Sequence, residues 1–206
     1  MIALESILTI SKSDLQEASK TLDKEDIPQL VEWLTLKDDD ARYRVFLLLQ
    51  NRSIFCDDVY PYWDVLRKKL KSDNSYQRST GLVLIAENAR WDTENRMEDT
   101  IDEYLTLLND EKPVTIRQCI QSLGKIAQAR PCLNEKIASS LINFDLMAVK
   151  ETMRKSILLD IVNVLLMIRK KRKNDDEIDG FIFNSLSGEI LDKKAKRQIK
   201  NLLQQG

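Results

Sequence analysis

The residue types that most often carry enzyme chemistry are sparse in this chain. Its 206 residues include no histidine, which removes Ser–His–Asp and Cys–His nucleophile systems, histidine-ligated metal sites and the commonest general base at neutral pH. The cysteines Cys56, Cys119 and Cys132 lie in or beside apolar stretches, and no two have metal-ligand spacing. The five glycines are isolated, so there is no phosphate-binding glycine loop. The sequence therefore predicts a protein that is not an enzyme, with no metal site and no cofactor.

The first candidate site is a group of residues where two predicted helices meet: Arg90, Trp91, Asp92 and Arg96. An aromatic ring flanked by charges is typical of the residues that dominate binding energy in protein interfaces. The structural alternative is that Trp91 closes a helical hairpin while Asp92 caps the next helix and pairs with Arg96. Both interpretations are compatible with the sequence.

The second candidate site follows an acidic turn and consists of Lys112, Arg117, Gln118, Gln121 and Lys125. On a helix beginning at residue 114, the last three share one face, opposite the apolar Ile116, Ile120 and Leu123. A polar groove for a peptide or a nucleic-acid strand is one interpretation, and a solvated helix face is the other. A further basic run, Arg169 to Lys173, could contact phosphate or meet the dipole at a helix C-terminus.

Helices are the elements expected to position these groups. Only four prolines and five glycines occur, and apolar residues recur at intervals of three and four from end to end. Pro28 and Pro113 stand where a first helical turn tolerates proline. The pattern predicts twelve helices, at residues 1–10, 12–22, 26–35, 40–51, 60–71, 75–90, 93–108, 114–129, 133–142, 148–172, 176–186 and 190–204.

The predicted helices repeat as pairs in which an acidic turn precedes a helix that opens with arginine. The arginines stand at positions 44, 78, 117, 154 and 197, so the steps are 34, 39, 37 and 43 residues. A period of about 40 residues is typical of two-helix HEAT units. We therefore expect an all-α fold, a right-handed α-α superhelix of the HEAT/armadillo-like class with about five helical hairpins. It would form one domain over 1–206, with an N-terminal cap at about 1–24, repeats at about 25–175 and a C-terminal cap at about 176–206.

Residues 81–172 resemble a group of short bacterial, Firmicute-type HEAT-like proteins labelled "SufBD protein". The likeness is carried by residues 89–96 (ARWDTENR), 102–105 (DEYL) and 110–120 (DEKPVTIRQCI). The resemblance implies a HEAT-like fold and a cytoplasmic setting, and it implies no reaction. The label refers to iron–sulfur assembly scaffolds, which are β-rich, whereas this chain lacks clustered cysteines, so cluster ligation is not expected.

Two classes of function fit these observations. The first is a non-enzymatic interaction module or scaffold with a protein or peptide partner. The second is a nucleic-acid-binding protein, because some DNA glycosylases that remove alkylated bases are also HEAT-like and use residue types such as Trp91, Asp92 and Arg117. A net charge of −1 disfavours strong backbone binding. No membrane span is expected, since the most apolar run, 157–168, contains Asp160 and Asn163. The oligomeric state stays open.

Overall fold

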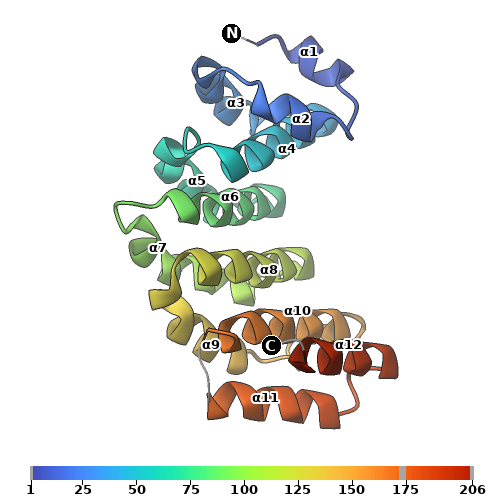
Figure 1. Ribbon diagram of the computed structural model, residues 1–206. Coiled ribbons are helices and arrows are strands. Elements are labelled where there is room, and N and C mark those ends of the chain that lie inside the picture. The colour runs from blue at the N-terminus through green and yellow to red at the C-terminus, as the bar shows by residue number, and fades with distance from the viewer. Residues whose placement is uncertain (1, 172–174, 205–206) are drawn as a thin grey trace. The chain divides into compact units, whose positions relative to one another are not determined.

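The computed structural model describes residues 2–171 and 175–204, and over these residues it contains twelve α-helices, five short 3-10 helices and no strand (Figure 1). The expected all-α class is confirmed. Each of the twelve predicted helices has a counterpart, with the largest differences at ends. The chain divides into two compact units, Met1–Thr100 (unit 1) and Ile101–Gly206 (unit 2). No helix in the described ranges has both the length and the apolar character that crossing a bilayer requires.

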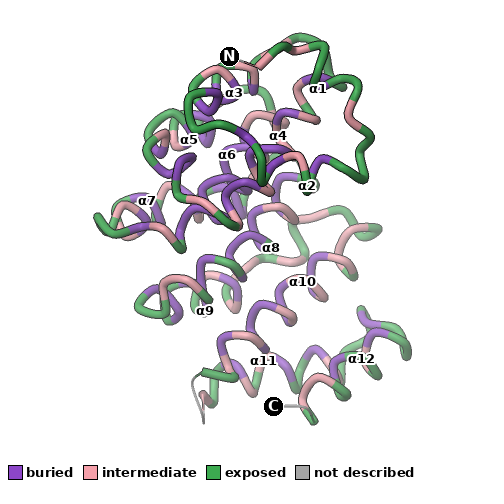
Figure 2. The backbone as a smooth tube through the Cα atoms, turned by 45° about the horizontal axis from the view of Figure 1, so that its top comes forward, coloured by how far each residue is buried: buried purple, intermediate pink, exposed green. Residues whose placement is uncertain are grey.

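Unit 1 is built on two long helices, α4 (Asp39–Phe55) and α6 (Ser75–Asn88), which pack on each other. Four short helices surround them: α1 (Leu4–Thr9), α2 (Leu15–Lys20), α3 (Ile27–Trp33) and α5 (Trp63–Lys69). The first three of these pack on α4, and α5 packs on α6. Figure 2 shows α6 as an almost continuous buried stretch, in agreement with the burial of every residue from Thr80 to Ala89.

Close approach between α5 and α6 depends on a glycine. A Cβ placed on Gly81 would lie 2.9 Å from the carbonyl oxygen of Leu66 and 3.1 Å from Cβ of Lys69. Real Cβ atoms do not come so close to a backbone oxygen, so the two helices could not keep this separation with any larger residue. Gly81 thus sets the distance at which the last turn of α5 passes the first half of α6.

Unit 2 is built on α8 (Pro113–Ala129) and α10 (Glu151–Arg169), the two helices in closest mutual packing. The helix α7 (Arg96–Leu105) crosses the boundary between the units, and η4 (Thr106–Asn109) packs on α8. The remaining helices of unit 2, α9 (Asn134–Ile142), α11 (Asp176–Ser187) and α12 (Lys193–Gln204), all pack on α10. Its core consists of aliphatic side chains such as Ile120, Leu123, Ile161 and Leu165, each at most 1% exposed.

The long helices begin at regular intervals, although not in the register that the arginines predict. The N-cap residues of α4, α6, α8 and α10 are Asp38, Asn74, Lys112 and Lys150, so the steps are 36, 38 and 38 residues. Arg42, Arg78 and Arg154 each stand four residues after the N-cap, where α8 has Ile116. The expected equivalence of Arg44 and Arg117 with Arg78 and Arg154 is therefore wrong by one or two residues. The helix starts are thus spaced more evenly than the arginines that the sequence pattern aligns.

The three arginines that share this position also share a set of contacts. Arg42 Nη1 donates to the carbonyl of Leu36 at 2.7 Å. Arg78 Nη1 donates to the carbonyls of Ser72 and Asp73 at 2.8 and 3.0 Å. Arg154 donates to the carbonyls of Val149 and Met147 at 3.2 and 3.1 Å. Each guanidinium thus holds the backbone of the turn that precedes its own helix, an arrangement we call the turn latch.

Acids of the turn pair with arginines at the start of α4. Arg42 pairs with Asp39, and Arg44 pairs with Asp40 at 2.6 Å. Arg78 and Arg154, like Arg42, donate to backbone carbonyls, which are strong acceptors and would otherwise need water. The latch therefore stabilises the turn itself.

Candidate functional site

Asp92, at the centre of the first candidate site, caps the irregular turn that leads into α7. The residue is 5% exposed, and its carboxylate accepts backbone N–H groups from Arg96 at 3.0 Å and Met97 at 2.9 Å. Asn95 in this turn has φ 58°, a left-handed conformation that asparagine tolerates. Asp92 is thus a helix cap, although the helix begins at Arg96 and not at residue 93 as predicted.

The same carboxylate also receives a buried tyrosine. The hydroxyl of Tyr60 donates to Asp92 Oδ1 at 2.9 Å. Burial, together with this hydrogen bond to a carboxylate, raises the pKa of Tyr60 to about 12, because both disfavour the phenolate. Tyr60 is therefore a fixed donor throughout the physiological pH range.

Arg96 does not form the predicted pair with the carboxylate of Asp92. Only its backbone N–H reaches Asp92, while its side chain pairs with Glu94 at 2.8 Å and lies over the ring of Tyr60, 5.3 Å from the centroid. The oxygens of Asp92 already accept N–H groups and the tyrosine hydroxyl, which leaves little room for a guanidinium. The prediction of an Asp92–Arg96 ion pair is therefore wrong.

Trp91, in the 3-10 turn η3 (Ala89–Trp91), is joined to the end of α4. Its indole Nε1 donates to the carbonyl of Ser53 at 2.7 Å, and Arg90 Nη1 donates to the carbonyl of Ile54 at 3.4 Å. Carbonyls in the last turn of a helix lack intrahelical donors. Both side chains therefore satisfy carbonyls at the end of α4, a helix outside the α6–α7 connection in which they lie.

The second candidate site lies on α8 in unit 2 and is organised by Asp160 of α10. Arg117 Nε donates to Asp160 Oδ2 at 2.7 Å, and Gln121 Nε2 donates to Asp160 Oδ1 at 3.1 Å. The side chain of Asp160 is 11% exposed. Its hydrogen bond raises the pKa of Arg117, so the guanidinium stays charged and oriented along the α8–α10 contact.

The remaining residues of this site follow the predicted helix faces. Ile116, Ile120 and Leu123 are buried, whereas Gln118 is half-buried and both Gln121 and Lys125 are exposed. Lys112 is exposed and pairs with Glu111 at 3.4 Å. We call the surface formed by Arg117, Gln118, Gln121 and Lys125 the α8 polar face.

Two residues that organise these sites, Tyr60 and Asp160, were not assigned to them from the sequence. Tyr60 lies 32 residues before Asp92, and Asp160 lies 43 residues after Arg117. An aspartate within an otherwise apolar run is a usable signal for a polar contact between helices, and Asp160 provides it. Nothing in the sequence around Tyr60 distinguishes it from the neighbouring aromatic residues.

Other residues considered from the sequence have varied surroundings. Arg169 pairs with Asp179, and Lys171 donates to the carbonyl of Gln128 at 3.0 Å, while Arg172 and Lys173 lie outside the described residues. Cys119 is fully buried, which raises the pKa of its thiol. Cys132 is exposed, contrary to the expectation of an apolar environment, because it lies in the 3-10 turn η5 (Pro131–Leu133).

Comparisons with known proteins identify no family for this chain. No family model matches it, and no curated protein matches it. Among solved structures, the crystal structure of an engineered protein is similar to this chain at 16% identity, covering 100% of this chain and 98% of that one with a TM-score of 0.47. A likeness at this level assigns neither family nor activity.

Proposed function

We propose that this protein is a non-enzymatic interaction module that binds a protein or peptide partner through the α8 polar face. In this proposal the helical hairpins form a right-handed α-α superhelix of the HEAT/armadillo-like class. The chain is then a relative of the bacterial proteins labelled "SufBD protein", and its setting is the cytoplasm. Small-angle scattering of the full chain tests the superhelix, which requires an elongated particle.

The observation that carries the proposal is the repeated turn latch. The same arginine position fixes the turn before α4, α6 and α10, so the structural unit is a helical hairpin repeated at 36 to 38 residues. Proteins built from such repeats use the exposed faces of successive helices as extended binding surfaces.

The α8 polar face is suited to a partner because its side chains are held in place before binding. Asp160 fixes the guanidinium of Arg117 and the amide of Gln121, which lowers the conformational entropy that binding would cost. Gln118 and Lys125 add an amide and a positive charge beside them. Amides and an oriented guanidinium match the carbonyls and carboxylates of a peptide.

Site-specific photo-crosslinking in the native host tests this assignment. A photoreactive amino acid at position 118 or 121 should capture a discrete protein, and Lys125→Glu should reduce the yield. The matched control is the same amino acid at Ser139, an exposed position on α9. Equal capture from position 139, or no capture from 118 and 121, would contradict the proposal.

Nucleic-acid binding is the alternative, and it has weaker support. The indole N–H of Trp91 and the carboxylate of Asp92 each have an intramolecular partner. A base or phosphate would have to displace those partners, at the cost of buried polar groups left unsatisfied. Micromolar binding to DNA that falls steeply with added salt would favour this alternative.

A further inference from the structure

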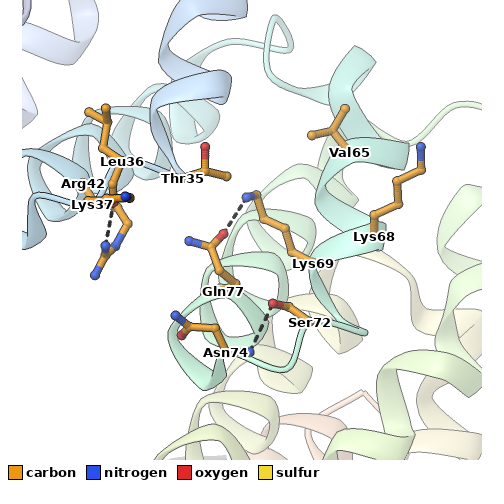
Figure 3. A pocket seen from close by; sticks show the side chains of 10 residues that line it. All are labelled: Thr35, Leu36, Lys37, Arg42, Val65, Lys68, Lys69, Ser72, Asn74 and Gln77. Carbon is orange, nitrogen blue, oxygen red and sulfur yellow. Dashed lines mark hydrogen bonds between the residues drawn. The ribbon is translucent and has the colours of Figure 1, made fainter.

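Unit 1 contains a cavity of about 490 Å³ whose lining is basic. It lies between the turn that joins α3 to α4 and the turn that joins α5 to α6 (Figure 3). Its cationic residues are Lys37, Arg42, Lys68 and Lys69, and no aspartate or glutamate is among the residues that line it. The volume falls in the range of small-molecule sites.

Lys69 is the unusual member of this lining. It is 8% exposed, and its ammonium group donates to Gln77 Oε1 at 2.6 Å. The amide of Gln77 donates in turn to the carbonyl of Leu34 at 2.7 Å, which fixes the amide oxygen toward Lys69. The positive charge is therefore buried against a neutral acceptor, and Figure 3 shows the hydrogen bond between Lys69 and Gln77.

Burial of this kind disfavours the charged form of lysine. Desolvation lowers the pKa of Lys69, and one neutral hydrogen bond does not replace the hydration of an ammonium group with three donors. An anion in the cavity would compensate for the lost hydration. The site is therefore arranged so that a bound anion relieves an unfavourable charge.

Two further lysines surround the same opening. Lys37 follows α3 and Lys68 lies on α5, on either side of Lys69 in Figure 3. Both are exposed, and within the described residues the side chain of neither has an ion pair or a hydrogen bond. Arg42, by contrast, is held by the Leu36 carbonyl and by Asp39. Lys37, Lys68 and Lys69 thus place three lysines along the lining of one cavity.

Neutral groups complete the lining. The hydroxyl of Ser72 can donate to an anionic oxygen, and Val65, 43% exposed, offers an apolar contact at the rim. We propose that this cavity binds a phosphomonoester dianion carried on a small organic group, with Lys69 contacting the phosphate and Val65 contacting the group. Compact lysine charges suit a doubly charged phosphate, and the cavity is larger than a phosphate alone.

Titration calorimetry of the full chain with phenyl phosphate at constant ionic strength tests the site. We expect saturable one-site binding, with inorganic phosphate binding more weakly and benzoate, a singly charged anion, more weakly still. Lys69→Met should weaken binding by about tenfold or more, since it removes a charge-assisted hydrogen bond. The variant should fold, because the substitution removes a buried charge without removing volume.

Two further variants keep the test decisive. The double substitution Lys37→Met with Lys68→Met changes only exposed side chains and should also weaken binding. Lys71→Met removes one charge from an exposed residue outside the lining and should leave the affinity within twofold of the unchanged chain. Absence of binding at millimolar phenyl phosphate, equal loss with Lys71→Met, or wild-type affinity in Lys69→Met would overturn the proposal. Tighter binding of a single-stranded oligonucleotide, which carries only phosphodiesters, would also overturn it.

Discussion

The two units bury polar groups in different ways. Among the described residues, every buried charged side chain lies in unit 1: Asp26, Arg52, Asp58, Lys69, Arg78, Glu87 and Asp92. The buried polar residues of unit 2 are the uncharged Thr115, Ser122, Asn134 and Ser185. One half of the chain therefore buries charged side chains that hydrogen-bond to backbone and polar groups, and the other half is held mainly by aliphatic packing.

Helix length explains much of this contrast. Helices α1, α2, α3 and α5 have six or seven residues each, and short helices have a high proportion of backbone groups without intrahelical partners. In unit 2, α10 has 19 residues and buries eight aliphatic side chains. Unit 1 consequently needs side chains that satisfy carbonyls and N–H groups, whereas unit 2 can rely on continuous apolar faces.

The largest expected effect comes from the buried ion pair of unit 1. Arg52 donates to Asp58 at 2.9 and 2.7 Å and to the carbonyls of Ser19 and Lys20 at 3.1 Å. Arg52→Met leaves the carboxylate of Asp58 buried without its partner and should cost about 4 kcal/mol of unfolding free energy. Urea denaturation measures the loss, and hydrogen exchange should place it in peptides of unit 1.

A double variant separates the pair from its surroundings. Arg52→Met combined with Asp58→Leu removes both charges and should recover a large part of that loss. If the double variant is no more stable than Arg52→Met, the contacts to the carbonyls of Ser19 and Lys20 matter more than the ion pair. Unit 1 would then differ from unit 2 through side-chain hydrogen bonds to backbone carbonyls, and not through a buried ion pair.

The corresponding change in unit 2 is an apolar deletion. Leu165 is fully buried in α10, and Leu165→Ala should cost about 3 kcal/mol by loss of transfer free energy and creation of a cavity. Leu165→Met, which keeps the volume, should cost less than about 1.5 kcal/mol. Thermal and urea unfolding measure both. Similar losses in the two variants would show that shape, and not buried volume, governs this core.

Tyr60 supplies a pH-dependent test of unit 1. Its pKa is raised from 10 to about 12 in the folded protein, so between these values the unfolded chain loses the phenolic proton first. The Tyr60 contribution is complete below pH 10 and is lost as pH rises toward 12. At neutral pH, Tyr60→Phe should lower the free energy of unfolding by roughly 1 kcal/mol because one hydrogen bond is lost. The variant should also lack the loss of stability that titration of Tyr60 causes above pH 10.

Phenolate absorbance and alkaline unfolding of the two proteins provide the measurement. The difference in stability between the unchanged chain and Tyr60→Phe should be constant from neutral pH to about 10 and should shrink above it. A difference that grows with alkaline pH would contradict the assigned contact between Tyr60 and Asp92.

The smallest effect is expected at the ion pair of the α8 polar face. The side chain of Arg117 is 36% exposed, so Asp160→Asn should cost less than about 1 kcal/mol at low salt, and added salt should reduce the difference. Unfolding at two salt concentrations measures it. A loss as large as that of Arg52→Met would mean that unit 2 also depends on a buried charge.

The sequence alone was sufficient for the helices. Apolar residues at intervals of three and four reveal a helix face, because that periodicity is a property of the helix itself. The buried Ile116, Ile120 and Leu123 and the exposed Gln121 and Lys125 were predictable for this reason. So were the early prolines, since Pro28 and Pro113 occupy first turns as expected.

Tertiary structure decided which polar groups meet. The hydroxyl of Tyr60, the carboxylate of Asp92 and the cavity around Lys69 depend on contacts between separate helices, and no periodic pattern encodes those distances. In the sequence, Lys69 is one of several neighbouring basic residues, and nothing distinguishes it from them. Only the packing of α5 on α6 places its charge against Gln77. Local pattern specifies helices because their hydrogen bonds are local, whereas a binding site requires the distances that packing alone provides.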